Sequence, residues 1–190
     1  MQLHNKILFI GPMGAGKTTA IQTLSDQAAA TTEVQNSNRA LYDKQTTTVA
    51  MDYGSIQLDD NQQIHLYGIP GQKHFEPVWP VIAKGAIGAI LLVNASHPDW
   101  QNDTLYLLQA FRAQVASGSV VVAANRTDDA QLQQLQQILT SHQYYLPVLL
   151  TDPRQRDDLV LALTGSMTDL ECNRHPTARL LAFARLPVAG

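Results

Sequence analysis

The residues best suited to chemistry lie near the N-terminus, in the segment Gly11-Pro12-Met13-Gly14-Ala15-Gly16-Lys17-Thr18. It matches the pattern G-x-x-x-x-G-K-[ST] and lies between a strand-like run, Lys6–Ile10, and a helical pattern. In this pattern backbone N–H groups surround a phosphate, Lys17 binds the β- and γ-phosphates, and the Thr18 hydroxyl suits Mg²⁺. The segment predicts a nucleoside-triphosphate site contacted by Gly11, Met13, Gly14, Ala15, Gly16, Lys17, Thr18 and Thr19.

A second candidate segment, Asn125-Arg126-Thr127-Asp128, follows the apolar run Val120–Ala124. A carboxylate at Asp128 can accept the N1–H and 2-amino hydrogens of guanine, and adenine lacks this pattern. Asn125 would fix the loop and the base edge, and the stem of Arg126 would cover the base plane. A strand followed by an Asx-type helix cap would give the same four residues, so both interpretations stay open.

The elements that must position these segments alternate along the chain. Strands are expected at Lys6–Ile10, Val49–Leu58, Gln63–Gly68, Ile87–Asn94, Val120–Asn125 and Tyr145–Thr151, and helices at about 17–30, 73–84, 100–116, 129–141 and 155–164. This order predicts an α/β domain with a six-stranded, mostly parallel sheet, one antiparallel edge strand and helices on both faces.

The antiparallel strand comes from a hairpin, because only four residues separate Val49–Leu58 from Gln63–Gly68. If its turn is centred near Asp60, paired residue numbers sum to 120, which places Asp52 opposite Gly68. Directly opposed side chains share one face of the sheet, about 5 Å apart.

Composition narrows the class of protein. The chain has 190 residues, a net charge of −3, 15% charged residues and one cysteine, which excludes an internal disulfide. A chain with this slightly negative net charge lacks the excess of Lys and Arg that proteins use to bind nucleic acid. No apolar run approaches a membrane span, and we expect a cytoplasmic protein without a stable membrane anchor.

Beyond these motifs, residues 4 to 164 resemble the small Ras-like GTPases. The match is carried by Gly11–Thr18, Thr48-Val-Ala-Met-Asp52-Tyr-Gly, Leu66-Tyr-Gly-Ile-Pro-Gly-Gln72 and Asn125-Arg-Thr-Asp128. The bacterial gliding-motility and cell-polarity GTPases of the Mgl type are the most similar in appearance. The resemblance implies a GTPase (G) domain over 1–165 and a C-terminal extension, a short helix or flexible tail, over 166–190.

The resemblance also implies two switch segments. Thr48 would bind Mg²⁺ through its hydroxyl, Gly71 would offer its N–H to the γ-phosphate, and Gln72, with Lys17, would be the catalytic side chain. Most relatives carry D-x-x-G-Q in the second segment, but this chain has Gly68 in place of the aspartate. After the sixth strand the usual S-A-K is replaced by Thr151-Asp152-Pro153-Arg154.

The hairpin register offers a substitute for the missing aspartate. We expect Asp52 to project its carboxylate across Gly68 and to hold the water shell of Mg²⁺; a solvent-facing edge residue is the alternative. Hydrolysis is expected to be slow, because Met13 crowds the γ-phosphate and no arginine immediately precedes Thr48. Arg39 is the nearest arginine.

These residues predict a GTP/GDP switch that hydrolyses GTP slowly with Mg²⁺ and acts on a protein partner through its switch segments. By resemblance, the partner would be a roadblock-type regulator or a GTPase-activating protein. Phe75, Trp79 and Val81 are the candidates for an exposed contact surface, and packing in the core is the alternative for Trp79. Two alternatives stay open: a scaffold whose nucleotide is structural, and an ATP-dependent enzyme.

Overall fold

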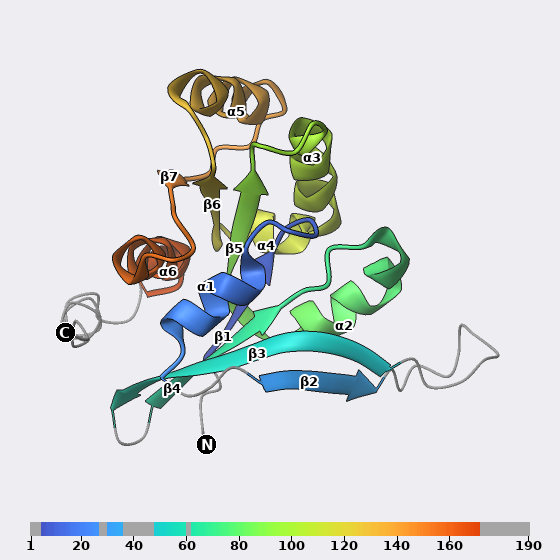
Figure 1. The fold of residues 1–190 in the computed structure, drawn as a ribbon, viewed down its shortest axis with the longest axis vertical. Coiled ribbons are helices and arrows are strands. Elements are labelled where there is room, and N and C mark those ends of the chain that lie inside the picture. Colours follow the sequence, from blue (N-terminus) through green and yellow to red (C-terminus); the bar gives the residue numbers. More distant parts are fainter. Residues whose placement is uncertain (1–4, 27–29, 36–47, 60–61, 172–190) are drawn as a thin grey trace.

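The computed structural model describes residues 5–26, 30–35, 48–59 and 62–171 (Figure 1). Their strands form one sheet in the order β2-β3-β4-β1-β5-β6-β7. β3 pairs antiparallel with β2 and β4, and the remaining pairings are parallel. The strands are β1 (Asn5–Ile10), β2 (Ala30–Gln35), β3 (Thr48–Asp59), β4 (Gln62–Gly68), β5 (Ala86–Asn94), β6 (Val120–Asn125) and β7 (Val148–Leu150).

Helices cover both faces of this sheet. Helices α1 (Lys17–Leu24) and α6 (Arg156–Glu171) lie together on one face (Figure 1). The opposite face carries the 3-10 helix η1 (Lys73–Val78), α2 (Trp79–Ala83), α3 (Trp100–Ala110), α4 (Arg112–Ala116) and α5 (Asp129–Ser141). The sequence-based fold class is confirmed: a phosphate-loop α/β domain with a mostly parallel sheet.

The sequence of β1 explains why this strand lies in the middle of the sheet. All but one of its residues are buried, and its side chains alternate between two cores. Leu8 and Ile10 pack with η1, α2 and α3, whereas Ile7 and Phe9 pack with α1 and α6. A strand that is apolar on both faces must be covered on both, which fixes the three-layer arrangement.

The hairpin register is confirmed. Asp52 pairs with Gly68, Gly54 with Leu66 and Ile56 with Ile64. The even-numbered side chains Ile56, Ile64 and Leu66 belong to the core beneath α1, and Asp52 shares their face of the sheet.

The structure differs from the predicted elements at several boundaries. The sheet has a seventh strand, β2, which is not among the expected strands, so β2 rather than β3 forms the antiparallel edge. Helix α1 ends at Leu24, six residues before its predicted end, where the Ser25 hydroxyl donates to the Ile21 carbonyl. Helix α6 runs to Glu171, seven residues beyond its predicted end at about residue 164.

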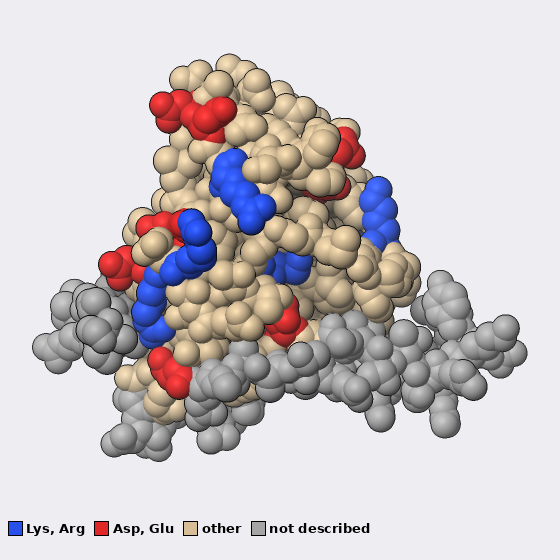
Figure 2. Space-filling model, in the orientation of Figure 1, with Lys and Arg blue, Asp and Glu red and all other residues tan. Residues whose placement is uncertain are grey.

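Some sequence-based predictions lie outside the described residues. These concern Arg39, Cys172, most of the C-terminal extension, and Thr46 and Thr47, either of which would replace Thr48 if the register slipped. Among the residues that the structure describes, no helix is long and apolar enough to cross a membrane. The face in Figure 2 carries a few basic and acidic side chains, some of them side by side, among wide uncharged areas, in keeping with the low charge.

Candidate nucleotide-binding site

The phosphate loop follows the carboxyl end of β1 and leads into α1, as the motif requires. Gly14 and Gly16 have φ angles of +77° and +104°, in the left-handed region that favours glycine. Gly16 is the N-cap of α1 and makes no side-chain cap, so helix N–H groups are directed at the loop. The loop therefore has the backbone form of an anion cradle.

Lys17 lies at the centre of this loop and is only 9% exposed. Its Nζ donates to the carbonyl oxygens of Gly11 and Pro12, both at 2.8 Å. Burial lowers the pKa of this ammonium group to about 8, against the opposing attraction of Asp52. A buried cation with only two neutral carbonyls and one nearby carboxylate is suited to receive an anionic phosphate.

Thr18 and Asp52 meet beside the phosphate loop. The Thr18 hydroxyl donates to Asp52 Oδ2 at 2.6 Å. The vacant side-chain position of Gly68 is what makes room: a Cβ there would lie 2.9 Å from Asp52 Cβ and 3.1 Å from Asp52 Oδ2. The glycine that replaces the usual aspartate thus admits a carboxylate from the neighbouring strand.

The second switch segment contacts the phosphate loop directly. A Cβ on Gly71 would collide with the Gly11 carbonyl oxygen and lie 2.9 Å from the Pro12 backbone. The adjacent Gln72 is exposed, and its Nε2 donates to the sulfur of Met13 at 3.5 Å. The candidate catalytic amide therefore lies against the side chain that was expected to crowd the γ-phosphate.

The segment after β6 is fastened to the same loop. Asn125 is buried, and its Nδ2 donates to the Ala15 carbonyl at 3.2 Å. Arg126 has a φ of +53°, and its side chain is exposed. Asn125 therefore ties the phosphate loop to the segment that was predicted to recognise the base.

Asp128 is the N-cap of α5. Its Oδ1 accepts from the Gln131 N–H at 2.7 Å, and the Gln131 side chain accepts from the Asp128 N–H at 3.1 Å, which completes a capping box. The helix-cap interpretation of this residue is therefore realised. A carboxylate has about four acceptor positions, so a cap leaves capacity for a base.

The loop after β7 closes the other side of the site. Pro153 is buried against Gly16, where an added Cβ would lie 2.8 Å from Pro153 Cγ, and the Thr23 hydroxyl donates to the Pro153 carbonyl at 2.8 Å. Asp152 binds Arg154 through Nε at 2.9 Å and through a terminal nitrogen at 2.7 Å. The hydrogen bond from Arg154 lowers the pKa of Asp152 to about 2.

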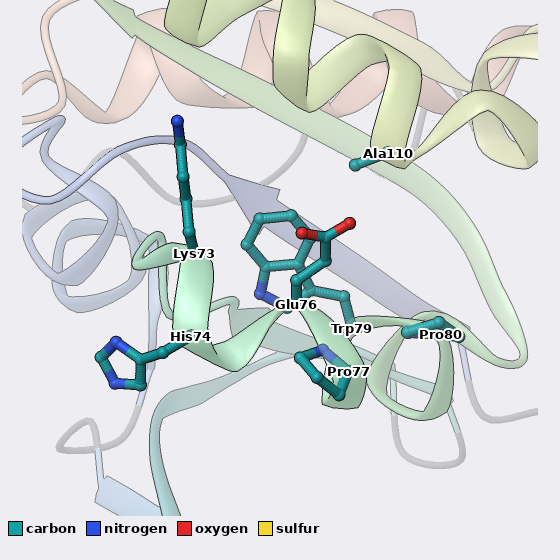
Figure 3. A pocket seen from close by; sticks show the side chains of 7 residues that line it. All are labelled: Lys73, His74, Glu76, Pro77, Trp79, Pro80 and Ala110. Carbon is teal, nitrogen blue, oxygen red and sulfur yellow. The ribbon is translucent and has the colours of Figure 1, made fainter.

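An open groove lies beside η1 and α2 (Figure 3), lined by Lys73, His74, Glu76, Pro77, Trp79, Pro80 and Ala110. Trp79 is only 2% exposed, stacks on Phe111 and donates its Nε1–H to the Pro70 carbonyl at 2.9 Å. Its side chain packs in the core and holds the second switch segment. Trp79 therefore does not belong to an exposed contact surface. Phe75 is half-buried and Val81 is 46% exposed.

The structure brings most of the predicted site residues together around the phosphate loop. Gly71, Asn125 and Asp52 all contact or neighbour it. Thr19 is exposed on the first turn of α1. Thr48 begins β3 opposite Gln35, and its predicted Mg²⁺ contact stays a prediction.

Two residues of this region were missed from the sequence. Asp158 accepts the Asp152 N–H at 2.9 Å. Arg156 donates to the carbonyls of Thr23 and Leu24 at the end of α1 and reaches Asp26 at 3.3 Å. Charged residues after a proline at the start of a helix were the available signal, but only the fold shows which backbone groups they reach.

The donors present fit Mg²⁺ bound together with nucleotide phosphates. The described residues hold no cluster of three or more His, Cys, Asp or Glu that could form a metal cage. Thr18 and Asp52 instead provide two adjacent oxygen groups beside the anion cradle. Mg²⁺ is usually held in this way, by one or two protein oxygens, water and phosphate.

A comparison with solved structures agrees with the fold. A solved structure, the G domain of the T. maritima FeoB iron transporter, superposes with a TM-score of 0.51 at 16% identity, covering 84% of this chain and 98% of that one. An uncharacterised protein of Methanocaldococcus jannaschii is 33% identical over 91 residues, 48% of this chain and 51% of the relative. The chain thus spans about half the length of that relative.

The family model described as Roc, Ras of Complex, domain of DAPkinase matches residues 6–128, more than half of the chain. The match includes the phosphate loop, both switch segments and Asn125–Asp128. Such a Ras-like G domain implies guanine-nucleotide binding with Mg²⁺. The family model and these two proteins are not described as gliding-motility or cell-polarity GTPases. The narrower resemblance to the Mgl type therefore stays a prediction. By this match, which covers more than half of its length, the chain belongs to the Roc family of Ras-like domains.

Proposed function

We propose that this protein is a GTP/GDP-binding molecular switch with slow, Mg²⁺-dependent GTP hydrolysis. The observation that carries the proposal is the hydrogen bond between Thr18 and Asp52 at 2.6 Å, beside the buried ammonium group of Lys17. This arrangement places a phosphate-binding cation and two oxygen groups suited to Mg²⁺ together at one end of the phosphate loop. Thr18 would bind the ion directly, Asp52 would hold its water shell, and Thr48 would join when a γ-phosphate is present.

Gln72 and Lys17 are the proposed catalytic side chains. Gln72 would orient the attacking water, and Lys17 would stabilise charge on the phosphate oxygens. The contact between Gln72 Nε2 and the Met13 sulfur supports slow hydrolysis, since the amide must leave Met13 to reach the water. A missing arginine finger can lower the rate by about 10³ to 10⁵.

The switch would act through a protein partner. The second switch segment continues into η1 and α2, where an open groove exposes charged and aromatic groups of Lys73, His74 and Glu76 (Figure 3). A change at Gly71 or Gln72 would be passed to this groove through the bond from Trp79 to the Pro70 carbonyl. A roadblock-type regulator or a GTPase-activating protein is the proposed partner, and cell polarity or motility the proposed setting.

One observation favours a second candidate, a scaffold with a structural nucleotide. Met13 is 74% exposed and contacts Gln72, so the amide has a partner other than water. A scaffold would adopt one conformation with GDP and with a non-hydrolysable GTP analogue. A switch would rearrange residues 31–48 and 68–84 between these two states.

The test begins with the nucleotide retained after gentle purification, identified by mass. GDP, GTP and ADP affinities are then measured with and without Mg²⁺, followed by phosphate release. Hydrogen exchange over residues 31–48 and 68–84 is compared between the GDP and GTP-analogue states. Retained guanine nucleotide, slow phosphate release and state-dependent exchange support the switch, whereas ADP binding as tight as GDP binding would overturn it.

A further inference from the structure

Three groups on one edge of guanine are available for recognition: the 2-amino and N1–H donors and the 6-oxo acceptor. Asp128 can accept from the two donors, but it cannot serve the 6-oxo group, which needs an N–H or O–H donor. Because the 6-oxo oxygen is bonded to the carbon next to N1, its donor must come from a segment beside Asp128. The inference below rests on the proposed guanine-nucleotide function.

Residues 151–155 form the neighbouring segment. Pro153 packs on Gly16, and Asn125 approaches the same glycine. The loop that follows β6 and the loop that follows β7 therefore both border the phosphate loop at Gly16. A base held between these loops would have its 6-oxo group within reach of residues 151–155.

Every backbone N–H of this segment already has an acceptor. Thr151 donates to the Ala124 carbonyl at 2.9 Å and holds the end of β7 beside β6. Pro153 has no N–H. Arg154 donates to Asp152 Oδ1 at 3.0 Å, and Gln155 donates to the Asp152 carbonyl at 2.8 Å.

The remaining donor, the Asp152 N–H, is bonded to Asp158 Oδ2 at 2.9 Å. Asp158 stands on the first turn of α6 and is half-buried. Hydrogen bonds to a charged acceptor are stronger than bonds to a neutral carbonyl, so a base oxygen competes poorly for this N–H.

Two side chains of the segment are engaged as well, and the side chain of Gln155 is exposed. Arg154 binds Asp152 through Nε and a terminal nitrogen, and the Thr151 hydroxyl donates to the Leu149 carbonyl at 3.3 Å. The guanidinium of Arg154 and the hydroxyl of Thr151 thus donate to other groups of the protein. Every backbone donor of residues 151–155 is thus already paired within the protein.

We propose that Asp158 is a specificity-determining residue of the base site: by accepting the Asp152 N–H, it occupies the backbone donor that would otherwise recognise a 6-oxo group. The site then selects purines by their N1–H and 2-amino groups through Asp128 and is tolerant at the 6-position. Base selectivity comes from one side of the site alone.

The experiment compares GDP with two analogues. The diphosphate of 6-thioguanosine keeps the N1–H and 2-amino donors but replaces the 6-oxygen by sulfur, a weak acceptor. Inosine diphosphate keeps the N1–H and 6-oxo groups and lacks the 2-amino group. Dissociation constants of all three and of ADP are measured with Mg²⁺ at slightly acidic pH, where the thio base keeps its N1–H.

For the unmodified protein we expect 6-thio-GDP and GDP to bind within about twofold of each other, and IDP to bind at least about fivefold more weakly than GDP. Asp158→Ala frees the Asp152 N–H and is expected to raise the preference for GDP over 6-thio-GDP to about fivefold. Its preference for GDP over IDP stays as in the unmodified protein.

Two variants serve as controls. Asp158→Asn keeps an acceptor oxygen and is expected to retain the tolerance for 6-thio-GDP. Asp157→Ala removes the neighbouring, exposed acid of the same helical turn and is expected to change neither preference. These variants separate the hydrogen bond from the charge and stability of α6.

The outcomes distinguish this inference from the proposed function. If GDP is preferred over ADP but the unmodified protein already rejects 6-thio-GDP about tenfold, or Asp158→Ala leaves the ratio unchanged, the role of Asp158 is overturned and guanine binding stands. If GDP binds no better than ADP, both are overturned.

Discussion

The Thr18 hydroxyl and the Asp52 carboxylate are 2.6 Å apart, although Thr18 lies in the first turn of α1 and Asp52 lies in an antiparallel strand 34 residues later. The pair exists because Asp52 stands opposite a glycine, Gly68, whose missing side chain leaves a path to α1. A carboxylate lost from one strand of this fold can therefore be supplied by the strand beside it.

Asp52→Ala is expected to remove most of the effect of Mg²⁺ on nucleotide affinity. Groups that support a metal from its outer shell typically contribute about 10- to 100-fold to metal affinity. The measurement is the GDP dissociation constant over a range of Mg²⁺ concentrations. Asp103→Ala, on helix α3, is the matched acid control. An unchanged Mg²⁺ dependence in Asp52→Ala would assign Asp52 a purely structural role.

Gly68→Ala is expected to lower the free energy of unfolding by about 1–3 kcal/mol, because the new methyl group would crowd Asp52 and Ile21. Adding Asp52→Gly should recover part of this loss, since it removes the atoms 2.9 and 3.1 Å from the new Cβ. Denaturant unfolding of the two single variants and the double variant forms a cycle. Additive losses would show that the two residues do not share this space.

Met13→Ala is expected to speed intrinsic GTP hydrolysis by about three- to tenfold, because Gln72 loses its alternative partner. Single-turnover phosphate release measures the effect. The gain must disappear when Gln72→Ala is added. A gain that persists without Gln72 would mean that Met13 acts on the γ-phosphate by itself.

Lys17 is expected to take up a proton when nucleotide binds near pH 8. Burial holds its pKa at about 8 in the described structure, and an anionic phosphate favours the charged form and raises that pKa. Each protein molecule therefore takes up about half a proton on binding nucleotide at pH 8, and a smaller fraction at lower pH. The affinity for GDP falls as the pH rises above 8.

Calorimetry in two buffers with different ionisation enthalpies measures this uptake. The Lys17→Arg variant, which stays charged throughout, provides the control. The absence of proton uptake at pH 8 in the unmodified protein would contradict the expectation.

Local patterns predicted the parts of the fold that depend on the nearest sequence. The short hairpin connection fixed the register that brings Asp52 to Gly68, because side chains in a strand alternate with a strict period of two. β2 could not be predicted in the same way. Its sequence, Ala-Thr-Thr-Glu-Val-Gln, is polar, and it forms only because the edge of β3 offers backbone partners.

The site was predicted in its residues more completely than in its contacts. The phosphate loop and Asn125 follow from motif and position. For Asp128 the sequence does not distinguish a helix cap from a base-binding residue, and the structure shows the cap. The bond from Asp158 to Asp152, the contact of Met13 with Gln72 and the burial of Trp79 each depend on segments far apart or on loop geometry. Spacing alone does not encode such contacts.

Met13 provides a spectroscopic reporter for this protein. It is one of four methionines, and its side chain is 74% exposed beside Gln72, whereas Met51 and Met167 are buried. A ¹³C-labelled methyl group at an exposed thioether gives a narrow resonance, and its chemical shift responds to charge and to neighbouring rings. A single methyl signal could therefore follow nucleotide exchange in solution without a dye or an introduced cysteine.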